Sequence, residues 1–320
     1  MASIIDGKFI RDEMTKNAMG GTELLAHRLV NNVDTKLMKG WQIHQSRVSD
    51  RDPSKKQILW CHDLAEDPAV AHLGKDDGWK MYDKIVFVSS WQQEQYKIYH
   101  DVPYSHGFVI PNAIEAIEEH QKPQDETIRL IYTSTPHRGL TLLFAAFEAL
   151  AKKYPNIHLD VYSSFKLYGW GERDKQFNSV FDKCNNHPQV TYHGSQTNTV
   201  VRKALKRSDI FAYPSIWKET SCLCLIEAMS AGLQCVHSNL AALPETSMGL
   251  TNMYGYVEDP QEHVNIFAAH LDSVIRTHQQ YLSDRALLRN MLNYPKPVID
   301  SRYDIEAFKK RWTALLTMLS

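Results

Sequence analysis

The stretch IFAYPSIWKETSCLCLIEAMSAGLQCVH, residues 210–237, contains one complete strand–helix–strand unit. Its two ends, Ile210–Tyr213 and Gln234–His237, are short apolar runs of the kind that form buried strands. Between them, Leu223–Ala231 has apolar residues at helical spacing. A strand, a helix and a second strand in this order are the unit from which parallel α/β sheets are built.

The same alternation extends along most of the chain. Several apolar runs are continuous rather than alternating, as expected where helices cover both faces of a parallel sheet. The other predicted strands are Ile58–His62, Lys84–Ser89, His106–Ile110, Arg129–Thr133, His158–Tyr162, Gln189–His193 and Tyr254–Val257. The other predicted helices are Thr22–Met38, Leu140–Lys152, Thr197–Lys206 and Val264–His278. The sequence therefore predicts an α/β protein with a doubly wound architecture.

One polar segment interrupts the alternation. Residues 111–127 are bracketed by Pro111 and Pro123, which disfavour uninterrupted regular structure. We therefore expect an N-terminal domain at 1–112, a linker at 113–127 and a C-terminal domain at 128–300. The stretch Tyr303–Leu319 is predicted to form an amphipathic helix whose apolar face must dock on another part of the chain.

Length and charge exclude several classes of protein. The 320 residues suggest two domains. Because 36 Lys and Arg nearly balance 37 Asp and Glu, the composition gives no reason to expect a nucleic-acid partner. No apolar run approaches the ~18–20 residues of a membrane span, and the first residues do not resemble a secretion signal. We expect a soluble cytoplasmic protein with no transmembrane segment, while peripheral membrane contact stays open.

The residues that commonly bind metals show no ligand pattern. The five cysteines are scattered and include no C-x-x-C pair, which indicates reduced thiols rather than disulfides or a zinc site. The 15 histidines include no H-E-x-x-H or similar spacing. We therefore expect no metal site and no cofactor.

The strongest functional signal lies inside the stretch quoted above. Glu227 falls within the predicted helix, and Glu219 lies in the loop before it. A carboxylate can accept hydrogen bonds from paired hydroxyls, and the helix N-terminus after Thr220 and Ser221 can face an anion. A surface glutamate on an amphipathic helix is the alternative, but the small and apolar neighbours of Glu227 argue against it.

Three further segments are candidates for binding. Gly20 and Gly21 precede a predicted helix and allow close backbone approach, although an ordinary turn would look the same. His62 ends a predicted strand, and a half-buried structural histidine is the alternative. Ser134 and Arg138 lie in a strand–helix loop, where an arginine can pair with phosphate oxygens. A solvated surface arginine is the alternative there.

Taken in order, these motifs resemble the family-4 (group 1) retaining glycosyltransferases of the GT-B fold. The resemblance is clearest from Glu219 to Glu227 and in the continuation Glu-Ala-Met-Ser-Ala-Gly. It is supported by the pairs Pro214-Ser215, Pro244-Glu245, Arg138-Gly139, Pro111-Asn112 and Gly20-Gly21. The likeness is strong over 130–245 and weaker over 1–111.

The resemblance implies two Rossmann-like, doubly wound domains that face a cleft. The second domain would bind a nucleotide-diphosphate sugar, and the first would bind the acceptor, a carbohydrate, a lipid-linked molecule or another small molecule. The final helix, 301–320, would join the first domain. Such enzymes are hexosyltransferase-like, retain the anomeric configuration and are metal-independent, and the nucleotide sugar is their substrate rather than a cofactor.

The resemblance also implies roles for single residues. Glu227 would accept hydrogen bonds from the ribose, while Glu219 and His62 would lie beside the transferred sugar. Arg138 would hold the diphosphate, which Gly21 would approach. The implied catalytic residues are Glu219, His62 and Arg138. The implied donor-binding residues are Gly20, Gly21, Ser134, Arg138, Lys218, Thr220, Ser221 and Glu227.

The sequence departs from the family pattern beside Arg138. The family usually has an earlier arginine in this loop, but Thr133 or Ser134 occupies its place here, so Lys218 or His137 could compensate. Two mechanisms stay open, same-face transfer through an oxocarbenium-like transition state and a covalent intermediate on Glu219. Two other functions stay open as well, a sugar-nucleotide epimerase of the same fold and a non-catalytic nucleotide-binding subunit.

Overall fold

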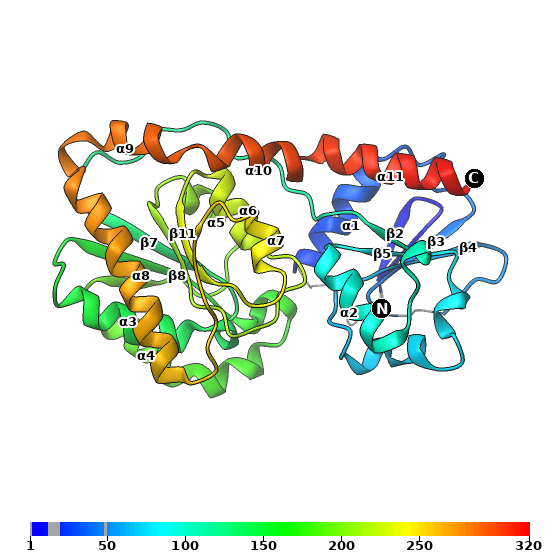
Figure 1. The fold of residues 1–320 in the computed structure, drawn as a ribbon, viewed down its shortest axis with the longest axis horizontal. Coiled ribbons are helices and arrows are strands. Elements are labelled where there is room, and N and C mark those ends of the chain that lie inside the picture. The colour runs from blue at the N-terminus through cyan, green and yellow to red at the C-terminus, as the bar shows by residue number, and fades with distance from the viewer. Residues whose placement is uncertain (1, 12–19, 48–49) are drawn as a thin grey trace. The chain divides into compact units, whose positions relative to one another are not determined.

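The computed structural model describes residues 2–11, 20–47 and 50–320, and their contacts form two compact units. Unit 1 comprises Met1–Glu115, Glu219–Leu223 and Arg302–Ser320. Unit 2 comprises Ala116–Lys218 and Cys224–Ser301. Each unit contains one six-stranded sheet with helices packed beside it (Figure 1).

The sheet of unit 2 is entirely parallel, in the order β12-β11-β10-β7-β8-β9. Its strands are β7 (Ile128–Thr133), β8 (Ile157–Tyr162), β9 (Val190–Tyr192), β10 (Ile210–Tyr213), β11 (Gln234–Ser238) and β12 (Asn252–Tyr254). The strand order reverses between β7 and β10. Parallel sheets bind their ligands beside the carboxyl ends of the strands at such a reversal, because the two loops leave toward opposite faces.

Helices cover both faces of this sheet. In Figure 1, α3, α4 and α8 lie on one side of it and α5, α6 and α7 on the other. Their bounds are α3 (Leu140–Ala151), α4 (Asn178–Asn186), α5 (Asn198–Leu205), α6 (Leu223–Ser230), α7 (Leu243–Ser247) and α8 (Pro260–Gln280). They are followed by α9 (Arg285–Leu292) and α10 (Pro295–Tyr303). The buried, apolar strands between these layers match the doubly wound architecture expected from the sequence.

The sheet of unit 1 has the order β2-β1-β3-β4-β5-β6 and is parallel from β3 to β6. Its strands are β1 (Ala2–Ile5), β2 (Lys8–Arg11), β3 (Trp41–Gln45), β4 (Lys56–Trp60), β5 (Lys84–Phe87) and β6 (Gly107–Val109). β1 and β2 form an antiparallel hairpin at one edge. The turn uses Asp6 and Gly7 with φ of 50° and 77°, the positive values that a two-residue hairpin of this type requires.

Two helices from distant parts of the sequence complete the core of unit 1. α1 (Gly21–Asn32) and α11 (Ile305–Leu319) contact each other. Phe308 and Trp312 of α11 have no exposed surface, and the Trp312 ring lies 5.0 Å from that of Trp60, centroid to centroid. Unit 1 also contains α2 (Ser90–His100).

Some predicted boundaries are wrong. The helix expected over Thr22–Met38 ends at Asn32, because Val33 is extended and the Asp34 carboxylate accepts the Lys36 amide at 2.9 Å in a turn. The strand expected at Tyr254–Val257 lies two or three residues earlier. Strands β1, β2 and β3 and helices α2, α4, α7, α9 and α10 had no predicted counterpart.

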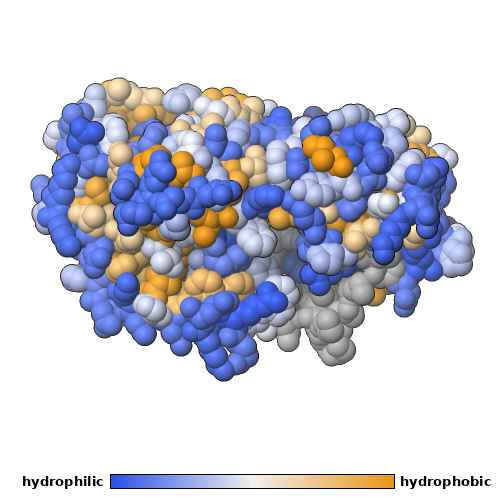
Figure 2. All heavy atoms as spheres, turned by 60° about the horizontal axis from the view of Figure 1, so that its bottom comes forward, coloured by the Kyte–Doolittle hydropathy of each residue, from blue (hydrophilic) through white to orange (hydrophobic). Residues whose placement is uncertain are grey.

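The described helices include none that combines the length and the apolar character needed to cross a membrane. On the face shown in Figure 2, hydrophilic side chains surround small separate apolar patches. Within the predicted linker, 113–127, the only ladder contact is a single bridge between Ile114 and Asp304, both in unit 1.

Candidate functional site

The two loops at the strand reversal of unit 2 touch each other at Gly139. This residue has φ of +123°, and a Cβ built on it would lie 2.2 Å from the carbonyl oxygen of Pro214. The loop after β7 and the loop after β10 can therefore meet only because residue 139 has no side chain. This contact fixes the backbone at the place where the fold predicts a ligand.

The cationic side chains of these loops are Arg138 and Lys218. Arg138 is half-buried, and its carbonyl oxygen accepts a hydrogen bond from the Ile216 amide at 3.4 Å. Lys218 is exposed in the facing loop. The description of Arg138 as a fully solvated surface residue does not fit this burial.

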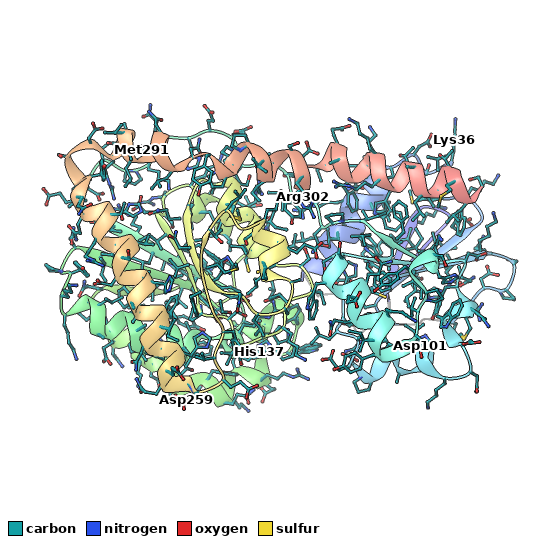
Figure 3. All side chains as sticks on the ribbon, in the orientation of Figure 1. Lys36, Asp101, His137, Asp259, Met291 and Arg302 are labelled. Atoms are coloured by element: carbon teal, nitrogen blue, oxygen red, sulfur yellow. The ribbon has the colours of Figure 1, made fainter. Side chains whose placement is uncertain are left out.

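His137 is held between two aromatic rings and is not a cation at neutral pH. Its ring stacks on Phe165 at 5.0 Å and meets the edge of Trp217 at 4.8 Å, centroid to centroid (His137 is labelled in Figure 3). Burial lowers the pKa of His137 to about 4, and the charges of Arg138 and Arg173 contribute to this lowering. A neutral His137 does not fit the hypothesis that it replaces the missing arginine, which favours Arg138 and Lys218 for this role.

Several hydroxyls at this edge of the sheet have unused hydrogen-bonding capacity. Thr133 is the last residue of β7, Thr135 lies in the loop after it, and Ser163 follows β8. Their side-chain oxygens are inaccessible to solvent and have no hydrogen-bond partner among the described residues. Most buried hydroxyls in native proteins are hydrogen-bonded, so these three suit a polar ligand at the carboxyl ends of β7 and β8. Ser134 is half-buried in the same loop.

Glu227 is buried, with 5% of its surface exposed, and is positioned by α5. Asn198 Nδ2 donates to Glu227 Oε1 and Oε2 at 3.1 and 3.2 Å, and an Arg202 nitrogen lies 3.3 Å from Oε1. The two partners lie four residues apart, on one face of α5. A carboxylate offers about four acceptor positions, so Glu227 keeps capacity for a ligand.

The other candidates gather in unit 1 around the segment Glu219–Leu223. Thr220 Oγ1 donates to the carbonyl oxygen of His62 at 2.9 Å, and Asn112 Nδ2 donates to that of Ser221 at 3.3 Å. A Cβ built on Gly21 would lie 2.8 Å from Leu223 Cδ1. Three segments that are far apart in sequence, near positions 21, 62 and 112, therefore contact one short loop.

Two other candidate residues of unit 1 are buried. Glu219 is 5% exposed. Gly20 is buried and directly precedes α1, whose backbone begins at Gly21.

His62 is half-buried and neutral at physiological pH. Its ring lies 4.7 Å from that of Trp60, and Nε2 is inaccessible and has no hydrogen-bond partner within the described part of the chain. Burial lowers the pKa of His62 to about 3. A neutral imidazole can donate from one ring nitrogen and accept at the other, so His62 can bind an uncharged polar group.

Buried histidines are expected to make the protein less stable as the pH falls below about 6.5. Burial lowers the pKa of His137, His237 and His278 to about 4 and that of His62 to about 3. Below the unfolded value of ~6.5, the unfolded chain binds protons that the folded chain does not, so each histidine removes up to about 1.4 kcal/mol per pH unit. Thermal melting between pH 7.5 and 5 measures this.

His137→Phe keeps a ring against Phe165 and is expected to flatten this dependence. If the wild-type protein has the same melting temperature at pH 7 and at pH 5, the assignment of these histidines as buried and neutral is contradicted.

The structure divides the predicted site residues into two groups. Unit 2 holds Ser134, Arg138, Lys218 and Glu227, and unit 1 holds Gly20, Gly21, His62, Glu219, Thr220 and Ser221. Sequence reasoning missed Asn198 and Arg202, although their spacing in a predicted helix placed them on one face. It also missed the hydroxyl of Ser163, for which the sequence holds no signal.

Among the described residues, no group of three or more His, Cys, Asp or Glu side chains could hold a metal ion. All five cysteines lie in the described ranges and are free thiols. Burial raises the pKa of Cys61, Cys184 and Cys235, which makes them poor nucleophiles.

Comparison with known proteins gives a consistent result. The sequence model of the family described as "Glycosyl transferases group 1" matches residues 112–287. A human component of phosphatidylinositol N-acetylglucosaminyltransferase is 28% identical over 141 residues, which are 43% of this chain and 28% of the human protein. The chain therefore aligns with less than a third of that relative.

Two longer matches extend over most of the chain. The lipopolysaccharide 1,2-N-acetylglucosaminetransferase of Salmonella typhimurium is 22% identical over 284 residues, 83% of this chain and 68% of that protein. The crystal structure of the Anabaena protein HepE with UDP and glucose superposes with a TM-score of 0.61 at 16% identity, over 82% of this chain and 72% of that one. At this identity the superposition shows the fold alone, and it confirms the predicted GT-B class.

Proposed function

Because the chain belongs to the group 1 glycosyl transferases, we propose that it is a retaining enzyme that moves a sugar from a nucleotide-diphosphate sugar to a carbohydrate or lipid-linked acceptor. The observation that carries this proposal is the buried Glu227 in unit 2. Asn198 and Arg202 orient its carboxylate but do not use all of its hydrogen-bond acceptor positions. Glu227 lies on α6, the helix that follows the β10 loop, in the same unit as Arg138.

The geometry suits the two polar parts of such a donor. Paired ribose hydroxyls would donate to the two oxygens of Glu227. The diphosphate would contact Arg138, with Lys218 supplying the second charge and the hydroxyls of Thr133 and Thr135 supplying neutral donors. Negative charge on the leaving diphosphate increases as the sugar departs, so these donors would act most strongly in the transition state.

The residues of unit 1 are assigned to the sugar. His62, held neutral by its surroundings, would bind a sugar hydroxyl, and Glu219 would lie next to the reacting carbon. Thr220 and Ser221 would present the backbone that precedes α6. In the same-face mechanism the leaving phosphate accepts the proton of the acceptor hydroxyl, and Glu219 stabilises the positive charge that develops on the sugar.

We propose a UDP-sugar as the donor and UDP-N-acetylglucosamine as the first compound to test. Support comes from the relatives, since the human and Salmonella proteins are named for transfer of N-acetylglucosamine and the Anabaena structure contains UDP and glucose. The acceptor is proposed only as a class.

The test is transfer or hydrolysis with a panel of UDP-, GDP- and ADP-sugars and with carbohydrate and lipid-linked acceptors. Mass spectrometry detects the product, and nuclear magnetic resonance reads its anomeric configuration. A folded protein that consumes none of the donors sinks the proposal, and a product of inverted configuration refutes retention. Conversion of the donor sugar without an acceptor would indicate an epimerase instead.

The two glutamates are expected to fail differently. Glu227→Gln should weaken UDP binding about 10-fold, because ribose contacts are present in free nucleotide as well as in substrate. Glu219→Gln should leave UDP affinity within about twofold and lower kcat, because its proposed neighbour is the reacting sugar. Calorimetry with UDP and steady-state kinetics separate the two effects. Equal losses of UDP affinity would overturn this division of roles.

A further inference from the structure

A small pocket opens at the opposite edge of the unit 2 sheet. It has a volume of about 30 Å³ and lies beside Asp209 and Gln234, which stand at the amino ends of β10 and β11. Lys122 of the linker and Arg285 and Arg289 of α9 line it as well. Since β7 has six residues, this edge lies about 15–20 Å from the loops that hold Arg138.

The pocket carries excess positive charge. Three cations, Lys122, Arg285 and Arg289, face one carboxylate, that of Asp209. His278 also lines the pocket, and burial lowers its pKa to about 4, so it adds no charge at neutral pH.

The single carboxylate is already occupied. Asp209 Oδ2 accepts the backbone amide of Arg129 at 2.9 Å and an Arg285 nitrogen at 3.1 Å. Arg285 in turn donates to the carbonyl oxygens of Pro123, Asp125 and Thr127, at distances of 2.9 to 3.0 Å. Asp209 and Arg285 therefore connect the linker to α9, and nearly all of their hydrogen-bonding capacity is used within the protein.

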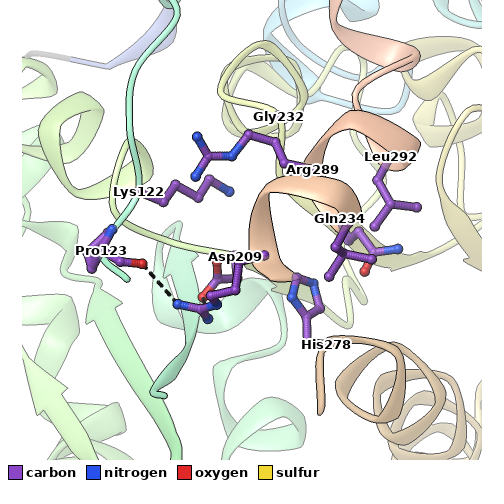
Figure 4. A pocket seen from close by; sticks show the side chains of 10 residues that line it. Lys122, Pro123, Asp209, Gly232, Gln234, His278, Arg289 and Leu292 are labelled. Carbon is purple, nitrogen blue, oxygen red and sulfur yellow. Dashed lines mark hydrogen bonds and ion pairs between the residues drawn. The ribbon is translucent and has the colours of Figure 1, made fainter. Parts of the chain in front are cut away.

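The other two cations, Lys122 and Arg289, have most of their hydrogen-bond donors available. The Arg289 side chain has one hydrogen bond, to the carbonyl oxygen of His120 at 3.0 Å. The Lys122 ammonium has no hydrogen bond or ion pair among the described residues. Figure 4 shows the Lys122 side chain extending into the pocket with the Arg289 guanidinium beside it, above Asp209. Burial near two arginines lowers the pKa of Lys122 to about 8, so a bound anion would relieve an unfavourable arrangement.

We propose that Lys122 and Arg289 form a binding site for one phosphate group, either inorganic phosphate or the phosphate of a phosphorylated metabolite, separate from the donor site. Three ammonium donors and a guanidinium match the three oxygens of a phosphate monoester. Because the pocket is small, a phosphate group would lie at its mouth, and the rest of a larger ligand would lie outside. Gln234 and His278 would form the neutral floor of the site.

Chemical labelling of Lys122 in the full wild-type chain tests this directly. Acetylation at pH 8 is followed by mass spectrometry with inorganic phosphate, with glucose 6-phosphate, or with chloride at equal ionic strength. Phosphate is expected to slow labelling of Lys122 at least fivefold and to leave the exposed Lys183 unchanged. Stronger protection by the sugar phosphate would identify a metabolite as the ligand. Equal labelling rates in phosphate and chloride overturn the proposal.

Calorimetry with inorganic phosphate provides the second measurement. Lys122→Ala is expected to lower the affinity at least 10-fold, whereas Lys183→Ala, the control for charge, and Arg138→Ala, the control for the donor site, should each change it less than twofold. If Arg138→Ala abolishes phosphate binding and Lys122→Ala does not, the anion occupies the donor site and the proposal is wrong. This outcome would leave the proposed transferase activity intact.

Discussion

Arg138→Ala is expected to lower the rate of sugar transfer by about 100-fold or more, the scale for losing one oriented electrostatic stabiliser. Burial keeps His137 neutral, so of the other residues considered for this charge in the two loops, Lys218 in the exposed part of the facing loop shares the proposed task. The arginine is always ionised, and its planar fork can contact two phosphate oxygens. Steady-state kinetics with a saturating donor measures the effect.

Three further variants make this result interpretable. Arg138→Lys should recover only part of the rate, because lysine keeps the charge and loses the fork. Arg207→Ala removes an exposed arginine of the same unit and should be neutral. If Lys218→Ala abolishes transfer while Arg138→Ala retains it, the required cation comes from the other loop.

Gly139→Ala is expected to abolish transfer and to destabilise the protein by about 2 kcal/mol or more. The added methyl group would lie 2.2 Å from the Pro214 carbonyl oxygen at φ of +123°, so the two loops at the strand reversal could not stay in contact. Arg138 and the residues after Pro214 would move apart. Denaturant unfolding and transfer assays together measure both effects.

Gly249 provides the matched control for this substitution. It also has a positive φ, +70°, but no atom lies within 4 Å of a Cβ built there. Gly249→Ala therefore carries only the backbone cost, about 1 kcal/mol, and should keep its activity. Equal losses in the two variants would show that the φ angle, and not the contact with Pro214, explains the effect.

The sequence predicts the sheet of unit 2 better than that of unit 1 for a physical reason. Strands such as β10 are buried on both faces and are apolar throughout, so they are visible in the sequence. β3 is buried as well, but it contains Gln42 and His44. Gln42 bonds to the Asp50 carbonyl and His44 to Gln57, at 2.7 Å each. Hydrogen bonding lets these polar residues be buried, and it hides the strand from hydrophobic patterning.

In the site as well, some features can be predicted from the sequence and others depend on packing. Glu227 could be identified from its motif, because its spacing from Glu219 and its place in a helix are properties of the sequence. Its partners Asn198 and Arg202 could be placed on a helix face but not assigned to a carboxylate, since that requires the packing of α5 on α6. The neutrality of His137 depends on Phe165 and Trp217, and their meeting around one ring follows only from the fold.

The burial of α11 in unit 1 has a consequence for biosynthesis. The part of unit 1 that precedes residue 116 cannot complete its core until Phe308 and Trp312 have been synthesised, because both side chains are fully enclosed in that core. The intervening 116–218 is synthesised earlier and can begin to fold meanwhile. Until then the surface of α1 that α11 covers stays exposed. The nascent chain therefore exposes apolar surface on unit 1 until α11 has been synthesised. Chaperones bind exposed apolar surface of this kind.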